Sequence, residues 1–403
     1  MWRAVIILLS LALFFGCGGA SPDESLISSG QASDSSAPTI SGQMNQRLVA
    51  DAGSDTTVDG DAASYDYEGW VVGWSGYLNS RQAVIYHDDH DRWSREELPH
   101  SVSDHSYLSG VAFLSPDNGW AVGGEYKSMY GEGLVLHRDA YGWSRADIPV
   151  MLCTGFSKVE FLDANHGWAL CSYLIGNGPI AYRYADGLWE PMFQNEWESN
   201  CRLYDLAPVA PDEVFSSAST EQSSGGLGVL FKYMDGALAA VMVGAWFDYF
   251  EGLEIAGGDG DAANCNWRMG YSAPNLYHYS GASWSWAPAN IHAGCVAEFA
   301  RAPGGAWYGT MYNGRPFLIK KSGKGWVEMD IPPGRWANPR SGLHDLAFPA
   351  DDFGVTVGDK GFGLPGVRVG YAIRYDGVEW RSIPDLMNQP WSFHGVSYVV
   401  SDR

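Results

Sequence analysis

The chain has 403 residues, of which 46% are hydrophobic and 18% charged, and its formal net charge is −22 at pH 7. This length and apolar content suffice for a sizeable folded core. Nucleic acids and anionic lipid surfaces bind proteins through clustered Lys and Arg, so the acidic balance argues against both classes of partner.

The first residues have the pattern of a secretory signal. Arg3 precedes an apolar run over residues 4–15, and small residues follow it. A run of this length is too short for a stable membrane-spanning helix. We therefore predict a signal peptide over residues 1–16.

Cys17 stands directly after the small residue Gly16. This arrangement resembles the lipobox of bacterial lipoproteins, in which the cysteine is acylated and becomes the new N-terminus. The resemblance implies lipid attachment at Cys17. Because Gly18 rather than Asp follows, it also implies the outer membrane of the cell envelope, on the periplasmic side or the cell surface. Cleavage near Ala20 would instead give a secreted, soluble protein.

Residues 17–64 have the composition of a flexible tether. The stretch 20–64 is rich in Ser, Asp, Gly and Thr and contains no aromatic residue. Such a segment cannot bury enough apolar surface to offset the entropy of ordering. The folded domain is therefore predicted over residues 65–403.

A Gly-Trp pair recurs along this domain, as in "SPDNGWAVGG" at 115–124 and "LDANHGWALC" at 162–171. The copies are spaced by about 40–53 residues, which identifies an internal repeat. Val replaces Trp in two of the units. The anchoring residues are Trp70, Trp120, Trp168, Val214, Trp267, Trp307 and Val355.

A second anchor recurs in phase with the first, after a short β-rich run and a polar turn, as in "LVLHRDAYGWSRADIP" at 134–149. Its residues are Trp93, Trp143, Trp189, Leu238, Trp284, Trp326 and Trp380. Each unit is thereby predicted to contain four short strands. Four strands per roughly 45 residues, with no amphipathic helix, is the period of propeller blades. We predict an all-β fold, a seven-bladed β-propeller of four-stranded blades.

The two ends of the domain indicate how the ring closes. The last residues, "HGVSYVVSDR" at 394–403, have the pattern of a first strand, and the first unit lacks a first strand of its own. We therefore predict that residues 395–403 pair with the strand at 69–74 and complete one blade.

The combined patterns "F…D…GWAVG" and "DG..W" resemble degenerate BNR or Asp-box-like propellers of the WD40/YVTN-like type, in particular photosystem II assembly factor propellers. The resemblance covers about residues 65–403 and implies architecture, not activity. Because the tryptophans recur at one register, we predict that they pack between blades. The Gly before each Trp is predicted to permit a tight turn.

Five cysteines follow Cys17, and an exported chain meets an oxidising compartment, so one or two disulfides are predicted. Cys265 with Cys295 is one candidate pair. A second pair is open among Cys153, Cys171 and Cys201.

Two kinds of stretch resemble metal sites without matching one. "HDDH" at 87–90 lies at the same turn as "HRDA" at 137–140, which favours a polar turn over zinc. The acidic stretches at 55–66 and 257–266 have only part of the EF-hand spacing. We predict no metal or cofactor, with weak Ca²⁺ binding at these stretches as the alternative.

The sequence favours a protein without catalytic activity. Sialidases have related propellers and bind a carboxylate with three arginines. Arg202 and Arg301 lie near predicted starts of central strands, but the sequence has no third partner in phase. A nucleophile elbow, a zinc-protease motif, a phosphate-binding loop and a dinucleotide fingerprint are all absent from the sequence.

Features that break the repeat are better candidates for a binding site. The insertions lie at 75–82, 125–133, 219–228 and 359–370. Aromatic residues cluster outside the repeat register where a connection between blades is expected. They are better candidates for ligand binding than the repeated tryptophans, although core packing is the favoured of the two alternatives for them. These residues are Trp246, Phe247, Tyr249 and Phe250.

We therefore predict a lipid-anchored, exported, monomeric propeller that acts as a binding or scaffold module for a protein or an envelope polysaccharide. The alternative is a hydrolase or lyase that acts on a glycan with loop-borne residues. Carboxylates and arginines clustered around the channel mouth would favour the enzyme, whereas an aromatic and polar rim would favour binding.

Overall fold

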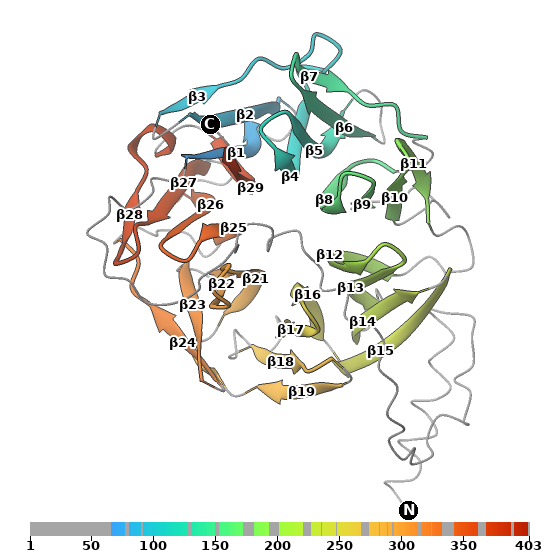
Figure 1. Cartoon of the computed structure of the whole chain (residues 1–403), viewed down its shortest axis with the longest axis vertical. Helices are drawn as coiled ribbons and strands as arrows, with labels where there is room; N and C mark the ends of the chain where they lie inside the picture. Colours follow the sequence, from blue (N-terminus) through green and yellow to red (C-terminus); the bar gives the residue numbers. More distant parts are fainter. Residues whose placement is uncertain are drawn as a thin grey trace, which may run out of the picture.

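The protein, seen in a computed structural model, is an all-β ring of seven blades around a central axis (Figure 1). The structure describes residues 66–401, except 77–79, 90–91, 127–130, 150–152, 172–180, 193–200, 221–226, 235, 247, 267–273, 282, 288, 292–293, 313–315, 324, 333–341, 362–367 and 388–390.

Each blade has four antiparallel strands, ordered from the innermost outward. Blade 1 consists of β29 (Trp391–Ser401), β1 (Asp66–Ser75), β2 (Gln82–Asp89) and β3 (Trp93–Arg95). Blade 2 consists of β4 (Ser106–Ser115), β5 (Asn118–Glu125), β6 (Glu132–Asp139) and β7 (Gly142–Arg145). Blade 3 consists of β8 (Phe156–Asp163), β9 (His166–Cys171), β10 (Ala181–Ala185) and β11 (Leu188–Pro191).

The remaining blades follow the same order. Blade 4 consists of β12 (Cys201–Ala210), β13 (Glu213–Thr220), β14 (Leu227–Met234) and β15 (Ala237–Trp246). Blade 5 consists of β16 (Asp248–Ala256), β17 (Asp259–Asn266), β18 (Asn275–Tyr279) and β19 (Trp284–Ala287). Blade 6 consists of β21 (Cys295–Arg301), β22 (Trp307–Tyr312), β23 (Phe317–Ser322) and β24 (Gly325–Met329), with β20 (Ala289–Asn290) parallel to β24. Blade 7 consists of β25 (Gly342–Ala350), β26 (Phe353–Gly361), β27 (Arg368–Tyr375) and β28 (Trp380–Ser382), followed by the 3₁₀ turn η3 (Pro384–Leu386).

The middle strands have continuous apolar runs in their sequences, because neighbouring blades cover both faces of each blade. Trp70 and Val72 of β1 pack toward blade 2, whereas Val71 between them packs toward blade 7. In the described part of the chain, one apolar cluster fills each of the seven spaces between neighbouring blades. The core is therefore distributed around the ring.

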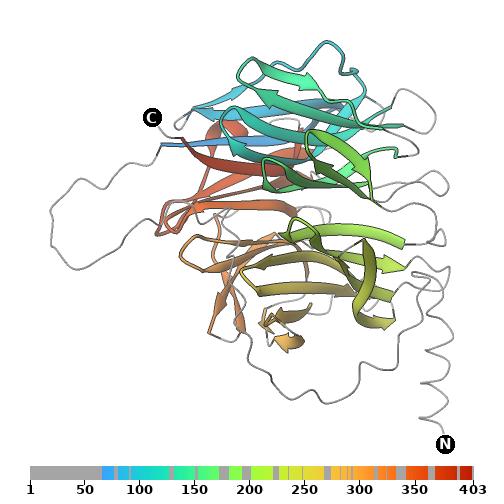
Figure 2. The ribbon, with the colours of Figure 1, turned by 45° about the vertical axis from the view of Figure 1, so that its right-hand side comes forward.

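The predicted closure is confirmed and is longer than expected. β29 pairs with β1 from Asp66 opposite Ser401 to Ser75 opposite Trp391. The blue first strand and the red last strand lie side by side in Figure 2. Both chain ends of the domain are therefore held in one blade.

The glycine before each repeated Trp has a different role from the one predicted. Gly119 lies within β5, opposite Phe113, and a Cβ atom there would lie 2.3 Å from the Phe113 ring. Gly167 has the same relation to Phe161. The glycine is needed because an aromatic ring of the innermost strand lies flat on it, and not because the chain turns there.

Two disulfides join neighbouring segments. Cys265 and Cys295 link blades 5 and 6, with their Cα atoms 5.2 Å apart, as predicted. The second bridge joins Cys153 to Cys171, Cα atoms 5.7 Å apart, which resolves the open pairing. Within the described residues, no helix has the length and apolar character to cross a bilayer. Cys17 and the predicted tether lie outside the described residues.

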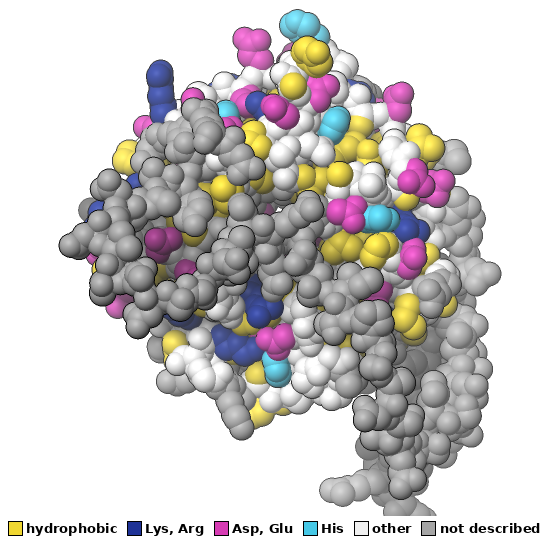
Figure 3. Space-filling model, in the orientation of Figure 1, with side chains coloured by type: hydrophobic (Ala, Val, Ile, Leu, Met, Phe, Trp, Pro, Cys, Tyr) yellow, Lys and Arg dark blue, Asp and Glu magenta, His cyan; other side chains and the backbone are white. Residues whose placement is uncertain are grey.

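The outer surface in view has mixed charge. Figure 3 shows acidic, basic and apolar side chains interspersed on this face, without a continuous basic area.

Candidate functional site: the central channel

The channel is shaped by a β-bulge that recurs in all seven innermost strands. In blade 3, for example, the register with β9 shifts between Phe156 and Lys158, so Ser157 has no partner across the ladder. Bulges at the same place occur in β4, β12, β16, β21, β25 and β29. A bulge re-aims the side chains around it. Consecutive residues, rather than alternate ones, therefore line the channel.

The bulges arrange the lining in layers along the axis. We call the face of the ring where the innermost strands begin the mouth face. The layer nearest that face is formed by the bulged residues, and it includes Ser109, Ser157, Tyr204, Glu251, Ala297, His344 and His394. The next layer is formed by Gly110, Lys158, Asp205, Gly252, Glu298, Asp345 and Gly395. All the residues of the first layer, and Gly110, Lys158, Glu298 and Asp345 of the second, line a polar cavity of about 570 Å³.

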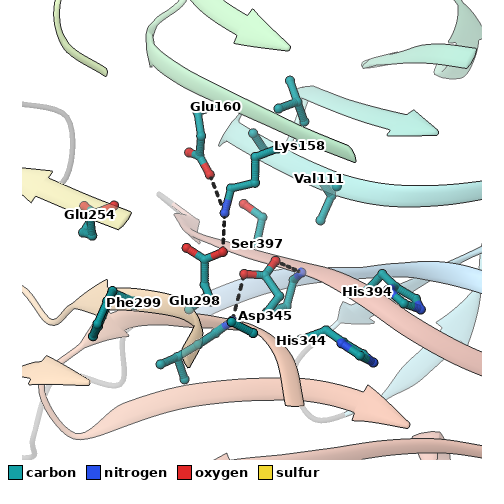
Figure 4. A pocket seen from close by; sticks show the side chains of 18 of the residues that line it. Val111, Lys158, Glu160, Glu254, Glu298, Phe299, His344, Asp345, His394 and Ser397 are labelled. Carbon is teal, nitrogen blue, oxygen red and sulfur yellow. Dashed lines mark hydrogen bonds and ion pairs between the residues drawn. The ribbon is translucent and has the colours of Figure 1, made fainter. Parts of the chain in front are cut away.

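Lys158 crosses the channel and connects opposite sides of the ring (Figure 4). Its Nζ lies 2.5 Å from Glu298 in blade 6, 3.3 Å from Asp205 in blade 4 and 3.4 Å from Glu160 in its own strand. An ammonium group has three donors, so three carboxylates saturate it. Burial alone would lower the pKa of Lys158, but these carboxylates raise it well above its usual range.

Two aspartates of the same layer bind backbone amides between blades. Asp205 accepts the N–H of Leu253 in blade 5 at 2.8 Å. Asp345 accepts the N–H of Val396 in β29 at 2.7 Å. Each aspartate also accepts the N–H of the residue that follows it, at 2.9 Å. These carboxylates thus connect neighbouring innermost strands.

Carboxylates exceed cations in this part of the channel. Burial raises the pKa of Glu160 to about 7, because one lysine cannot offset all the neighbouring acids. Burial and the charges of Glu160 and Asp205 raise the pKa of Glu254 to about 8. Burial likewise raises the pKa of Glu298, despite its contact with Lys158. At neutral pH, protons are therefore shared among these groups.

A different group of side chains lies nearer the mouth face, around the fully buried Asp359 of β26. Arg368 donates to Asp359 Oδ2 at 2.6 Å, and His344 Nε2 donates to the same oxygen at 3.2 Å. Ser392 also donates to this oxygen, at 2.6 Å. Because that hydroxyl has one proton, His394 Nε2–H must donate to Ser392 Oγ, at 2.7 Å.

Four planar groups stack in a column at this mouth. The His344 and His394 rings lie 4.4 Å apart, the His394 and Trp74 rings 3.9 Å apart, and the Arg81 guanidinium lies 4.4 Å from the Trp74 ring. We call Trp74, Arg81, His344, Arg368 and His394 the mouth cluster. In Figure 4 the two histidines lie beside each other, away from Lys158.

The mouth cluster is a poor metal centre. Donor atoms of His344, Asp359 and His394 lie within 4.8 Å of one another. However, the two imidazoles are nearly parallel, at 12°, so their lone pairs do not converge on one point. Arg368 also holds the carboxylate. A second group, Glu251 with Cys265 and Cys295, offers no thiolate because its cysteines form a disulfide.

The predicted aromatic candidates have mixed positions. Phe250 is fully buried in the cluster between blades 4 and 5, and Tyr249 packs at 5.5 Å against Tyr204, which lines the channel. Phe247 and the side chain of Trp246 lie outside the described residues. Burial of Phe250 agrees with the core-packing alternative for that residue, and ligand binding by this run stays a prediction.

Other predicted positions are placed as follows. Trp70 and Trp168 are fully buried, as expected of packing elements, whereas Trp267 lies outside the described residues. His87 lies in β2, not in a turn, and stacks on Trp70 at 4.6 Å. Residues 257–266 form a hairpin turn and β17, not a loop, and Asp261 accepts a bond from Lys321 at 2.6 Å.

Arg202 and Arg301 both line the cavity, as their positions in the sequence suggested. Arg202 lies at the start of β12, but Arg301 is the last residue of β21 and not near its start. The two arginines therefore lie toward opposite ends of the channel, so they do not form a joint carboxylate clamp.

The sequence contains a pattern that predicts the channel charges, but an alignment on the Gly-Trp pair does not reveal this pattern. Aligning the first strands as "LSGVAF", "FSKVEF", "LYDLAP", "VAEFAR" and "LHDLAF" places Lys158, Asp205, Glu298 and Asp345 at the third position, where Gly110 stands in blade 2. Charged residues at one position of a buried repeat indicate a shared polar axis. The mouth cluster has no such pattern, because its members come from four strands, β1, β25, β27 and β29, and from the residue just before β2.

No protein-family model and no curated protein matches this sequence. Among solved structures, a protein from Lactobacillus plantarum is similar, with 12% identity, a TM-score of 0.51 and coverage of 83% of this chain and 99% of that one. YCF48 from Cyanidioschyzon merolae has 14% identity, a TM-score of 0.45 and coverage of 72% and 89%. Prolyl oligopeptidase B from Galerina marginata has 11% identity and a TM-score of 0.49, and the match covers 80% of this chain and 51% of that one. At these identities the likeness shows the propeller fold alone.

Proposed function

We propose that the protein is a monomeric binding or scaffold module that holds a protein or an envelope polymer on its mouth face. The position of the insertions carries this proposal. Each insertion runs from the second to the third strand of its blade, and the second strands end at the mouth face. The segments that distinguish one blade from another therefore start and finish at strand ends around one mouth. They are 75–82, 125–133, 219–228 and 359–370.

The state of the channel carboxylates also supports binding over catalysis. Lys158 and backbone amides already bind Asp205, and a backbone amide of β29 binds Asp345. The mouth itself presents stacked aromatic, imidazole and guanidinium groups, and the exposed ring of Tyr126 lies 5.6 Å from Tyr107. A rim of this kind suits recognition of a ligand.

The experiment compares capture from native envelopes by crosslinking. A mouth variant, Arg81→Gln with Tyr126→Ala, is matched by a control, Arg381→Gln with Tyr141→Ala, whose side chains are exposed on outer strands and turns. We expect the mouth variant to lose the crosslinked partner and the control to retain it. Equal capture by both variants would place binding elsewhere and contradict the proposal.

We further propose that the protein is exported and anchored in the outer membrane through acylated Cys17. The residues that support this are the apolar run over 4–15 and the small Gly16 before the cysteine. Cys17→Ala should move the protein from the membrane fraction to the soluble fraction. Unchanged fractionation would rule lipid attachment out.

One observation favours the alternative of a glycan-acting hydrolase or lyase. Glu160 and Glu254 both line the cavity, and their raised pKa values, about 7 and about 8, are typical of general acids. Activity on a panel of glycans that Glu160→Gln or Glu254→Gln abolishes would establish the enzyme instead.

A further inference from the structure

The mouth cluster concentrates positive charge in a strongly acidic protein. It holds the guanidinium groups of Arg81 and Arg368 and two imidazoles, against one buried carboxylate, Asp359. Arg368 and His344 share that carboxylate. In a chain with a net charge of −22, a local excess of cations beside a cavity is a specific feature.

Arg81 is the cation of the mouth cluster whose N–H donors can bind a further group. Its guanidinium lies over Trp74 and donates to the Tyr126 hydroxyl at 3.4 Å. In the part of the chain that the structure describes, no carboxylate lies within ion-pair distance of it. Stacking on an aromatic face leaves the guanidinium edge, with its N–H donors, available to an anion.

The hydrogen bonds of the histidines make anion binding depend on protons. His344 and His394 both direct Nε2–H toward Asp359, the second through Ser392, so each neutral ring keeps a lone pair on Nδ1. A lone pair repels an anion. Binding of an anion at these rings therefore requires a proton on Nδ1.

The surrounding charges favour a coupling between anion binding and protonation of His394. Burial lowers the pKa of His394 well below its usual range, and the nearby positive charges of His344, Arg368 and Arg81 lower it further, against the carboxylate of Asp359. Asp345 on the neighbouring strand β25 points its carboxylate to the Val396 amide instead. An anion beside these cations would offset their effect and let the imidazole take up a proton.

The cavity below the mouth cluster suits a polyhydroxylated molecule better than a peptide. Its walls present hydroxyl, ammonium and carboxylate groups, as at Ser109, Ser157, Lys158 and Glu298. Phe113 and Phe161 of the wall are already occupied, because each lies flat on a glycine of the second strand of its blade. Peptide anchors require open apolar pockets, whereas the part of the wall that the structure describes is mainly polar.

We propose that the mouth cluster binds the carboxylate of an acidic oligosaccharide, a glycan built from uronic acids, and that its affinity increases as the pH falls. Arg81 binds the carboxylate of one sugar on one face of Trp74, and His394 on the other face of that ring donates to the carboxylate of a neighbouring sugar when it is protonated, while the sugar hydroxyls face the polar cavity. This inference rests on the proposed binding function and names the ligand class for that site.

The test is titration calorimetry of the full chain with oligogalacturonate and with the same oligomer fully methyl-esterified. The ester matches the acid in size and hydroxyls but lacks the charge. We expect the ester to bind at least about tenfold more weakly, since one hydrogen bond to a charged group contributes about 1.5–3 kcal/mol. Affinity for the acid should rise as the pH falls below the ordinary imidazole pKa of 6.5, because the pKa of His394 is lowered, and it should fall with added salt.

Three variants and one control make the test specific. Arg81→Gln should weaken binding of the acid about tenfold without changing binding of the ester, and Arg81→Lys should restore part of it. Arg381→Gln, on an exposed outer strand, is the matched control. His394→Asn should reduce the pH dependence, with thermal unfolding as the check on its fold.

The possible failures are distinguishable. Equal binding of acid and ester, or an Arg81→Gln variant that binds the acid normally, overturns the carboxylate site. Binding of a glutamate peptide with no binding of either glycan assigns the mouth to acidic peptides and contradicts the inference. If no glycan binds but the mouth variant still loses its partner from native envelopes, the binding function stands and this inference alone fails.

Discussion

At the scale of single residues, Lys158 is the internal counter-ion of the ring. It occupies the channel where three blades direct carboxylates inward, and its Nζ contacts Glu298, Asp205 and Glu160. One positive charge does not balance these acids, and so protons are retained at Glu160 and Glu254. The stability of the ring is therefore tied to protonation in its centre.

Replacing Lys158 with Met should destabilise the protein strongly, by about 3–5 kcal/mol, because removing one partner leaves buried carboxylates uncompensated. The loss should shrink at pH 5, where those carboxylates take up protons. Urea unfolding at pH 5 and pH 8 measures both effects. Lys232→Met, which removes a partly exposed pair with Glu213, is the control, with an expected loss below about 1 kcal/mol. A deficit for Lys158→Met that is independent of pH would point to packing instead of charge.

The stability of the wild-type protein should fall as the pH rises from about 4.5 to about 8. The pKa values of Glu160 and Glu254 in the folded protein, about 7 and about 8, exceed the ordinary value of 4.5. The folded state therefore binds more protons than the unfolded state across this window, and their contribution is lost as the pH rises. Thermal unfolding at several pH values should show a melting temperature that declines, and Glu160→Gln with Glu254→Gln should flatten the decline. A melting temperature that rises over this range would contradict the assignment.

At the scale of strands, every blade has a bulge in its first strand, and blades 1, 2, 3 and 7 also have a glycine in the second strand that lies under an aromatic ring. The glycine admits an aromatic ring from the innermost strand, as Gly119 admits Phe113. The bulge directs consecutive residues to the axis, as in β8 around Ser157 and Lys158. The first and second strands of such a blade thus pack tightly near the turn that joins them. Near its other end, the first strand presents polar groups to the channel.

Gly119→Ala should destabilise the protein by about 1–3 kcal/mol, because its Cβ would overlap the Phe113 ring. The double variant Phe113→Leu with Gly119→Ala should recover part of this loss, since the smaller side chain gives the methyl group room. Denaturant unfolding of the two single variants and of the double variant gives the coupling free energy between Phe113 and Gly119. Strict additivity of the two changes would show that the ring and the glycine do not interact as described.

At the scale of the whole molecule, the ring is closed by strand pairing between the two ends of the domain. β29 supplies the innermost strand of blade 1 and contributes Phe393 and Val396 to the core between blades 7 and 1. Asp345 of blade 7 binds the Val396 amide as well. Closure therefore involves backbone, core and channel at once.

Removing residues 395–403 should unfold the ring as a whole, with a loss above about 5 kcal/mol, which is comparable to the total stability of a typical domain. Loss of β29 exposes the edge of β1 and the apolar face beneath it. Circular dichroism during heating measures the change. A control that lacks only residues 402 and 403, beyond β29, should melt like the full chain. A truncated protein with an unchanged melting temperature would contradict the closure.

The sequence predicted the ring because blade packing repeats. Trp70 and Trp168 recur at one register because each packs between neighbouring blades, which is also why they are buried. Alignment on these residues therefore revealed the blades and the closure of the ring. The site was not predicted, because its residues depend on a register shift that leaves no regular period. His344 and His394 reach the channel only through bulges, and Asp359 and Arg368 reach them from neighbouring strands. Contacts between strands that are far apart in the chain cannot be read from spacing.

The position of β1 has a mechanical consequence. β1 begins at Asp66, directly after the predicted tether, and it is paired on both sides, with ten register partners in β29 and eight in β2. Hydrogen bonds in antiparallel ladders lie perpendicular to the strands. A force that pulls the tether along β1 would load both ladders in shear, so that many bonds resist together instead of opening one by one. A ring attached in this way would keep its shape while its anchor is pulled.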